Sequence, residues 1–421
     1  MKFEIGANYF KPGEKIIYNS ENTVNGHWVI LGASGVGKTH FLRRLLDEFK
    51  TAPNLRIHVF DSHGDIFTDE KQTSLVKFSE SSEYGINPFQ ISADPDFGGV
   101  RKRVNSFISM VNRNTGKIGQ RQEGVLRSLL YDMYARNGFY YTKPESWISD
   151  GKKVPTMLDL KKIAQEKMKK LVIGNFTRAL TALDELSKKT PRLEKQLGKH
   201  ISERDNDDID KLKDDIKNAF CIFIDNLSTG RELDEYLRYQ SKDVLQSTYN
   251  RIENLYSSGV FKDKPPSFHK SRPIWRYDIR ALSDAEKGFL VELYLEKIFF
   301  MAKKNGLSSV ITNYIIIDEA QNFMTEESEH IINIMMRESR KFGLAFVFAL
   351  QNFSKFPEDV IINAGSKLIL GVDEFHHELV ARKCGVNIKR LKAIEPRKTG
   401  LIQIKNHSTY MNNNYFSVCF P

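Results

Sequence analysis

The sequence predicts an α/β fold: a mostly parallel β-sheet with helices on both faces, interrupted by a large α-helical insertion. Three observations lead to this prediction. Short apolar runs typical of buried strands alternate with amphipathic helices near both ends of the chain. Between them, over residues 99–265, strand signals thin out and helical periodicity dominates. Hydrophobic residues make up 40% of the 421 positions, which is enough to bury a substantial core.

The first elements are expected in two segments. Residues 1–26 alternate weakly between apolar and polar and are broken by turn residues, which predicts a short β-hairpin that caps the next domain. Residues 27–98 form the first part of the core. This part opens with the buried-strand run His27–Leu31, continues at helical spacing over Thr39–Phe49, and adds a strand at Arg56–Phe60.

The insertion and the second part of the core follow. The insertion carries helical periodicity over Val104–Val111, Glu123–Tyr134, Met157–Lys170, Asn175–Leu186 and Leu233–Tyr256. Residues 266–421 return to strand–helix alternation, with a helix expected over Asp284–Lys304. The strands of this part are expected at Ile274–Asp278, Tyr314–Ile317, Ala345–Leu350, Lys367–Leu370, Thr399–Ile404 and Tyr415–Phe420.

Composition narrows the class of protein. The formal net charge is +10, which favours a polyanionic partner such as nucleic acid, although a solvated basic surface gives the same number. Cys221, Cys384 and Cys419 lie far apart and form no CxxC pair, so we expect no disulfide framework or zinc site and a cytoplasmic location. The first residues lack the apolar core of a signal peptide, and no apolar run approaches the ~20 residues that span a bilayer.

A phosphate-binding loop follows the first buried strand. The sequence GASGVGKT fits the pattern G-x-x-x-x-G-K-[ST] in full, with a strand before it and an amphipathic helix after it. Its glycines let backbone N–H groups surround phosphates, its lysine supplies a positive charge to the β- and γ-phosphates, and its threonine hydroxyl binds Mg²⁺. The expected nucleotide-binding residues are Gly32, Ala33, Ser34, Gly35, Val36, Gly37, Lys38 and Thr39, followed by His40.

Two carboxylates follow the most apolar strand. Asp318 and Glu319 come directly after Ile315–Ile317, at the strand end where ligands bind in open α/β sheets. We expect Asp318 to hold Mg²⁺ through its water shell and Glu319 to act as the general base on the attacking water. An acidic helix cap after a strand is the alternative interpretation.

Polar residues at the ends of a later strand are further candidates. Gln351 follows the strand Ala345–Leu350, where a polar side chain can sense the γ-phosphate. Arg337 and Arg340 lie on the helix expected before that strand, from which an arginine finger can reach the phosphates of a neighbouring subunit. A turn residue and a solvated basic helix face are the corresponding alternatives.

Together these segments resemble the HerA/FtsK superfamily of ATPases, including the motor ATPases of conjugation and type IV secretion. The resemblance covers roughly residues 27–404. It rests on segments that occur in order along the chain: LGASGVGKTH, FDSHGDI, YGINPF, GQRQEGVLRSLL, PTMLDL, IIIDEAQNF and RESRKFGLAFVFALQ.

The resemblance implies a RecA-like core in which the Gln351 strand lies between the P-loop strand and the strand before Asp318. It implies ATP and Mg²⁺ as cofactors, a homo-oligomeric ring, expected to be a hexamer, with nucleotide at the subunit interfaces, and DNA in the central channel. It makes Arg340 the better finger candidate, with Arg337 second. Asp61, in the turn DSHGD, is expected to shape the nucleotide site together with Asp65.

The chain departs from the family pattern in two places. HerA-type members usually carry a β-barrel before the P-loop, where this chain has only the short hairpin. Ser62 stands where the family turn usually has proline. The missing barrel puts ring stability and partner docking in question.

Three functions remain open. The first is a DNA-translocating ATPase that works with a partner nuclease or other effector in DNA processing or antiviral defence. The second is a conjugation or type IV secretion motor. The third is an ATP-dependent assembly switch or scaffold that moves nothing. A two-lobed helicase is excluded because no second P-loop-like lobe is present, and a GTPase because no Asn-Lys-x-Asp segment occurs.

Overall fold

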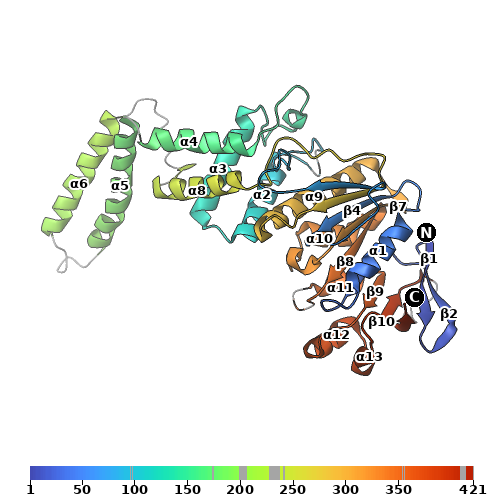
Figure 1. Cartoon of the computed structure of the whole chain (residues 1–421). Helices are drawn as coiled ribbons and strands as arrows, with labels where there is room; N and C mark the ends of the chain where they lie inside the picture. Colours follow the sequence, from blue (N-terminus) through green and yellow to red (C-terminus); the bar gives the residue numbers. More distant parts are fainter. Residues whose placement is uncertain are drawn as a thin grey trace. The chain divides into compact units, whose positions relative to one another are not determined.

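The structure is a computed structural model that describes residues 1–94, 96, 98–172, 175–198, 206–226, 238–239, 242–352, 354, 356–407 and 414–420. The chain forms two compact units, shown as a ribbon in Figure 1. Unit 1 comprises Met1–Ile86 and Lys264–Pro421. Unit 2 comprises Asn87–Asp263.

The described residues of unit 1 form one sheet of eleven strands in the order β2-β1-β11-β10-β9-β3-β8-β7-β4-β6-β5. The strands from β9 to β5 pair in parallel, whereas β10, β11, β1 and β2 pair antiparallel. The predicted fold class, a RecA-like P-loop core, is confirmed, and so is the place of β8 between β3 and β7. The strands are β1 (Lys2–Asn8), β2 (Lys11–Asn19), β3 (Trp28–Leu31), β4 (Arg56–Asp61), β5 (Thr73–Lys77), β6 (Ile274–Asp278), β7 (Ser308–Ile317), β8 (Phe342–Leu350), β9 (Ser366–Ile369), β10 (Thr399–Ile404) and β11 (Phe416–Cys419).

Helices cover both faces of this sheet. The amphipathic helix α1 (Lys38–Phe49) buries its apolar stripe in a core cluster that includes Ile316 and Val347. Side chains alternate across a strand, so Ile317 and Phe348 face the opposite side. There α9 (Asp284–Asn305) packs against β8, and the ring of Phe299 meets that of Phe342 at a centroid distance of 5.9 Å.

Local sequence explains where these elements begin. Helix α9 begins at a capping box, in which the Ser283 hydroxyl accepts the N–H of Glu286 and the Glu286 carboxylate accepts the N–H of Ser283. The strands β3 and β8 consist almost wholly of buried apolar residues, as expected for parallel strands covered on both faces. Shorter helices complete the unit: α10 (Ile331–Glu338), α11 (Glu358–Asn363), α12 (His377–Cys384) and α13 (Ile388–Lys392).

The antiparallel strands extend the sheet beyond β9. The hairpin of β1 and β2 joins the sheet through β11, which itself pairs with β10. The Arg44 side chain on α1 donates to the carbonyls of Ile5 at 2.8 Å and Glu4 at 2.7 Å. These bonds attach the hairpin to the helix that follows the P-loop.

Unit 2 is helical in its described residues. Its helices are α2 (Val100–Thr115), α3 (Gln120–Arg136), α4 (Met157–Val172), α5 (Asn175–Leu197), α6 (Asn206–Asp225) and α8 (Lys242–Ser257). Of the helix expected over 233–256, residues 233–237, 240 and 241 lie outside the described residues. In the described part of the chain, no helix combines the length and apolar character needed to cross a bilayer.

Two elements differ from the sequence-based expectation. Strand β5 had no predicted counterpart. The helix expected to carry both Arg337 and Arg340 into β8 ends at Glu338, so Arg340 lies in a short 3₁₀ turn (Ser339–Lys341). This second point corrects the expected placement of Arg340 on the helix.

Candidate functional site

The P-loop connects β3 to α1. Gly35 and Gly37 adopt φ angles of 77° and 109°, a left-handed backbone region that glycine enters without strain. Gly37 caps α1, which has no capping side chain and no acidic residue in its first turn. The first N–H groups of α1, at the positive end of the helix dipole, are therefore available to an anion.

Lys38, the first residue of α1, is buried. Its ammonium group donates to the carbonyls of Gly32 and Ala33, each at 2.8 Å. Burial lowers the pKa of Lys38, and the carboxylates of Asp318 and Glu319 act in the opposite direction. The loop therefore holds a positive charge between the helix N-terminus and the carboxylates that follow β7.

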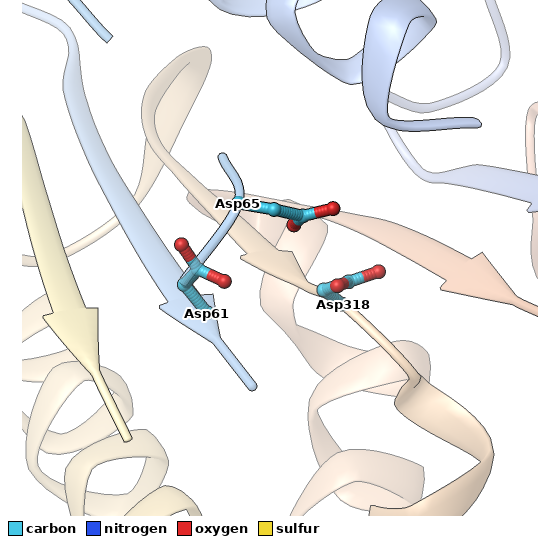
Figure 2. A group of neighbouring side chains, drawn as sticks. All are labelled: Asp61, Asp65 and Asp318. Carbon is cyan, nitrogen blue, oxygen red and sulfur yellow. The ribbon is translucent and has the colours of Figure 1, made fainter. Parts of the chain in front are cut away.

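Three carboxylates meet at the tips of two neighbouring strands. Figure 2 shows Asp61 at the end of β4, Asp65 in the turn that follows, and Asp318 directly after β7. Oxygens of all three lie within 4.8 Å of one another. Burial raises the pKa of Asp318 to about 6, and the negative charges of Asp65 and Asp61 add to the shift. Concentrated negative charge of this kind is relieved by a cation.

The three carboxylates differ in what they already bind. The oxygens of Asp61 accept hydrogen bonds from Arg276 at 2.9 and 2.6 Å and from the N–H groups of His63, Gly64 and Ile66. Asp61 therefore holds the turn in shape.

By contrast, one buried oxygen of Asp65, Oδ1, has no hydrogen-bond partner among the residues that the structure describes. Its other oxygen lies 3.4 Å from the Thr39 hydroxyl. Thr39, Asp65 and Asp318 thus form a set of hard oxygen ligands that fits Mg²⁺.

Glu319 lies beside this set in a specific geometry. It adopts a left-handed backbone conformation, φ 52° and ψ 41°, which is uncommon for a residue with a side chain. Its Oε1 accepts a hydrogen bond from Gln351 Nε2 at 2.9 Å and lies 2.8 Å from His63 Nε2. The hydrogen bond between His63 and Glu319 raises the pKa of His63. Residues that follow three adjacent strands, β4, β7 and β8, are thus brought together at Glu319.

Sequence reasoning missed several residues of this site, among them His63, Arg397 and Phe420. His63 lies in the quoted turn DSHGD, and its position between two aspartates was the available signal. Arg397 lines the same pocket and donates from Nε to the carbonyl of Gly35 at 2.8 Å. Arg397 carries no signal in the sequence, because it lies in a polar loop far along the chain from the P-loop.

The two finger candidates do not reach this site within one chain. Arg337 and Arg340 are exposed and precede β8, whereas Gln351 follows it. A strand of nine residues is about 30 Å long, so the arginines lie at the opposite edge of the sheet from the P-loop. Arg337 donates to the carbonyl of Ser328 at 2.8 Å. A role for either arginine in a neighbouring subunit stays a prediction.

The site opens into a pocket of about 860 Å³. One end is lined by the P-loop with Asp65, Asp318 and Gln351. The other end extends along the first turns of α1 to Arg397 and Phe420. A volume of this size matches that of small-molecule and cofactor sites.

Comparison with known proteins agrees with this geometry. Residues 3–96 match the family model described as the central domain of helicase HerA. The resemblance to the HerA/FtsK superfamily is confirmed. The match covers the hairpin, the P-loop and the turn of Asp61. No curated protein matches the sequence.

Solved structures show the same fold over nearly the whole chain. VirB4 of Thermoanaerobacter pseudethanolicus is 14% identical with a TM-score of 0.65, over 100% of this chain and 96% of that one. The plasmid coupling protein TrwB, in complex with ADP and Mg²⁺, is 12% identical with a TM-score of 0.50, over 94% and 85%. TrwB in complex with the ATP analogue ADPNP gives a TM-score of 0.51. At these identities the likeness concerns the fold.

Proposed function

We propose that this chain is an ATPase that hydrolyses Mg²⁺-bound ATP. The observation that carries the proposal is the meeting of Lys38, Asp65 and Asp318 in one pocket, with the Glu319 carboxylate held by two polar side chains that line it, His63 and Gln351. The TrwB complexes with ADP, Mg²⁺ and ADPNP support the choice of ligand.

Each residue has a defined task in this mechanism. Lys38 and the N-terminus of α1 bind the β- and γ-phosphates. Thr39, Asp318 and Asp65 would hold Mg²⁺, which when bound would neutralise charge on the phosphate oxygens. Glu319 takes the proton of the water that attacks the γ-phosphorus, the bond to the β–γ bridging oxygen breaks, and ADP and phosphate leave. His63 and Gln351 orient the Glu319 carboxylate.

We further propose that the ATPase is a ring-forming DNA translocase of HerA type, expected to be hexameric, that works with a partner nuclease or effector. The family match over residues 3–96 and the formal net charge of +10 support this proposal. An arginine finger from a neighbouring subunit, Arg340 or Arg337, would complete each site. A conjugation-type motor is the second candidate, because the VirB4 likeness extends over the entire chain. A nuclease gene beside this one favours the first candidate, and a pilus gene favours the second.

Two substitutions test the ATPase. Lys38→Ala should abolish ATP binding, because it removes the positive charge at the phosphates. Glu319→Gln should keep ATP binding and lower turnover by about 10²- to 10⁴-fold, the usual contribution of a general base. Glu326→Gln is the matched control on the exposed segment after the site and should change neither. Normal hydrolysis by Glu319→Gln contradicts the catalytic assignment.

A separate measurement tests the motor. Molecular mass in solution, with ATP and with or without duplex DNA, should be read together with the ATPase rate. A ring whose turnover rises with DNA supports a translocase. An ATPase rate that is unchanged by DNA instead supports an assembly switch.

A further inference from the structure

The pocket continues well beyond the phosphate end. Arg44 borders it five residues after Thr39, which is about 7–8 Å further along the axis of α1. The lining also includes Arg397, which precedes β10, and Phe420, which follows β11. β10 and β11 are paired strands of the sheet, so both wall residues rest on regular structure.

Arg397 is held against the P-loop. Its Nε bond to the Gly35 carbonyl places the guanidinium at the pocket wall. Its backbone has a φ of 67°, a conformation that non-glycine residues rarely adopt unless the surrounding structure imposes it. Next to it, a Cβ atom added to Gly37 would meet Arg397 Cγ at 3.9 Å, so Arg397 runs close beside the P-loop and leaves about the width of one methyl group. The cationic plane is therefore set in place by the loop that binds phosphate.

The Phe420 ring is fixed from two sides. It meets the buried Phe41 of α1 edge-on, with ring centroids 5.8 Å apart at an interplanar angle of 62°. It also lies over Gly400 of β10, where an added Cβ would approach the ring atoms to 3.1 Å. The backbone N–H of Phe420 donates to the Lys398 carbonyl at 2.9 Å. The ring thus has a defined position at the pocket wall.

This end of the pocket has the chemistry of a stacking site. Among its described lining residues are an aromatic ring and a planar cation, while the lining carboxylates, Asp65 and Asp318, lie at the phosphate end. Arg44 is engaged with the carbonyls of β1 and adds positive charge beside them. Aromatic rings and guanidinium planes both bind the π-face of a nucleobase.

We propose that Phe420 and Arg397 form the nucleobase subsite of this chain and hold the base of the bound nucleotide by stacking. This inference rests on the proposed ATPase function and names the part of the substrate that the catalytic residues do not contact. Stacking recognises the face of a base and not its hydrogen-bonding edge. The subsite therefore accepts adenine and guanine with similar affinity and binds the smaller pyrimidines more weakly.

Calorimetric binding of ADP, GDP, CDP and inorganic pyrophosphate in the presence of Mg²⁺ tests the subsite without turnover. Phe420→Ala should weaken ADP and GDP binding about tenfold, the loss typical of one base–aromatic contact, and leave pyrophosphate binding unchanged. Phe420→Leu keeps apolar volume against Phe41 and should show the same selective loss. Phe416→Ala is the matched control, because Phe416 is an exposed ring on β11, the strand that precedes Phe420, and lies outside the pocket.

Two results overturn the inference. One is unchanged ADP affinity in Phe420→Leu. The other is an equal loss of ADP and pyrophosphate affinity, which indicates a general effect on the P-loop. The proposed ATPase fails differently: a wild-type chain that binds ADP through its base and hydrolyses no ATP refutes the function and keeps the subsite.

Discussion

Breaking the buried ion pair between Asp61 and Arg276 should strongly destabilise unit 1. The Asp61 side chain is fully buried and that of Arg276 is 9% exposed. Asp61→Asn keeps Oδ1, which accepts the N–H groups of His63 and Gly64. It places an NH₂ group where Oδ2 accepts Arg276 and the N–H of Ile66. A buried guanidinium is then left without its carboxylate, which costs about 3–5 kcal/mol of unfolding free energy.

Thermal unfolding followed by circular dichroism measures this effect. A loss of about 4 kcal/mol lowers the Tm by roughly 8–16 °C in a folded unit of 150–250 residues. Arg276→Met and the double variant complete a double-mutant cycle, and the double variant should be more stable than the sum of the single losses predicts. Lys15→Met removes the exposed pair with Glu4 and should change stability by less than about 0.5 kcal/mol. A loss under about 1 kcal/mol for Asp61→Asn refutes the reasoning.

Two histidines give further predictions. His63→Ala removes a partner of Glu319 and should lower single-turnover ATP hydrolysis about 10- to 100-fold with unchanged ADP affinity. The exposed His269→Ala should change neither the rate nor the affinity, and a large loss of ADP affinity in His63→Ala contradicts the prediction. His27 is buried and accepts the N–H of Phe346, and burial lowers its pKa from 6.5 to about 4. Between these pH values only the unfolded chain binds the proton. The unfolding free energy should therefore fall as the pH falls from 6.5 to 4, by up to about 1.4 kcal/mol per pH unit. His27→Asn keeps an acceptor, and urea titrations should show a shallower dependence on pH; equal slopes for the two proteins count against His27.

The core of the sheet could be predicted because its strands are covered on both faces. A continuous run such as Ile315–Ile317 is buried at every position, so apolar residues alone mark the strand. Polar residues that follow such runs, Asp318 and Gln351, necessarily lie at one edge of a parallel sheet. Their proximity to Lys38 follows from strand order, which the family resemblance implied and the structure confirms. Their catalytic roles stay predictions.

The features of the fold and the site that the sequence did not predict depend on contacts between distant segments. Strand β5 places Thr73 and Ser74 on buried positions and Leu75 on an exposed one, so it lacks the apolar pattern that predicts a strand. Arg276 gives no sign in the sequence of its bond to Asp61, which arises because β6 and β4 are neighbours. Arg397 reaches the P-loop only through the folded sheet, on which β10 pairs with β9 beside β3.

The two places where the chain passes between unit 1 and the helical unit 2 have a consequence for how proteins of this architecture can diversify. The backbone leaves unit 1 just after Gly85 and returns at Lys264, and the N–H of Gly85 donates to the Lys264 carbonyl at 2.9 Å. The strands that precede and follow unit 2 along the chain, β5 and β6, are adjacent at the edge of the sheet. Any polypeptide whose own ends meet could be grafted between these two residues with little strain on the catalytic scaffold. Unit 1, which carries the P-loop, and the helical unit 2 are therefore separable modules whose sequences can change at different rates.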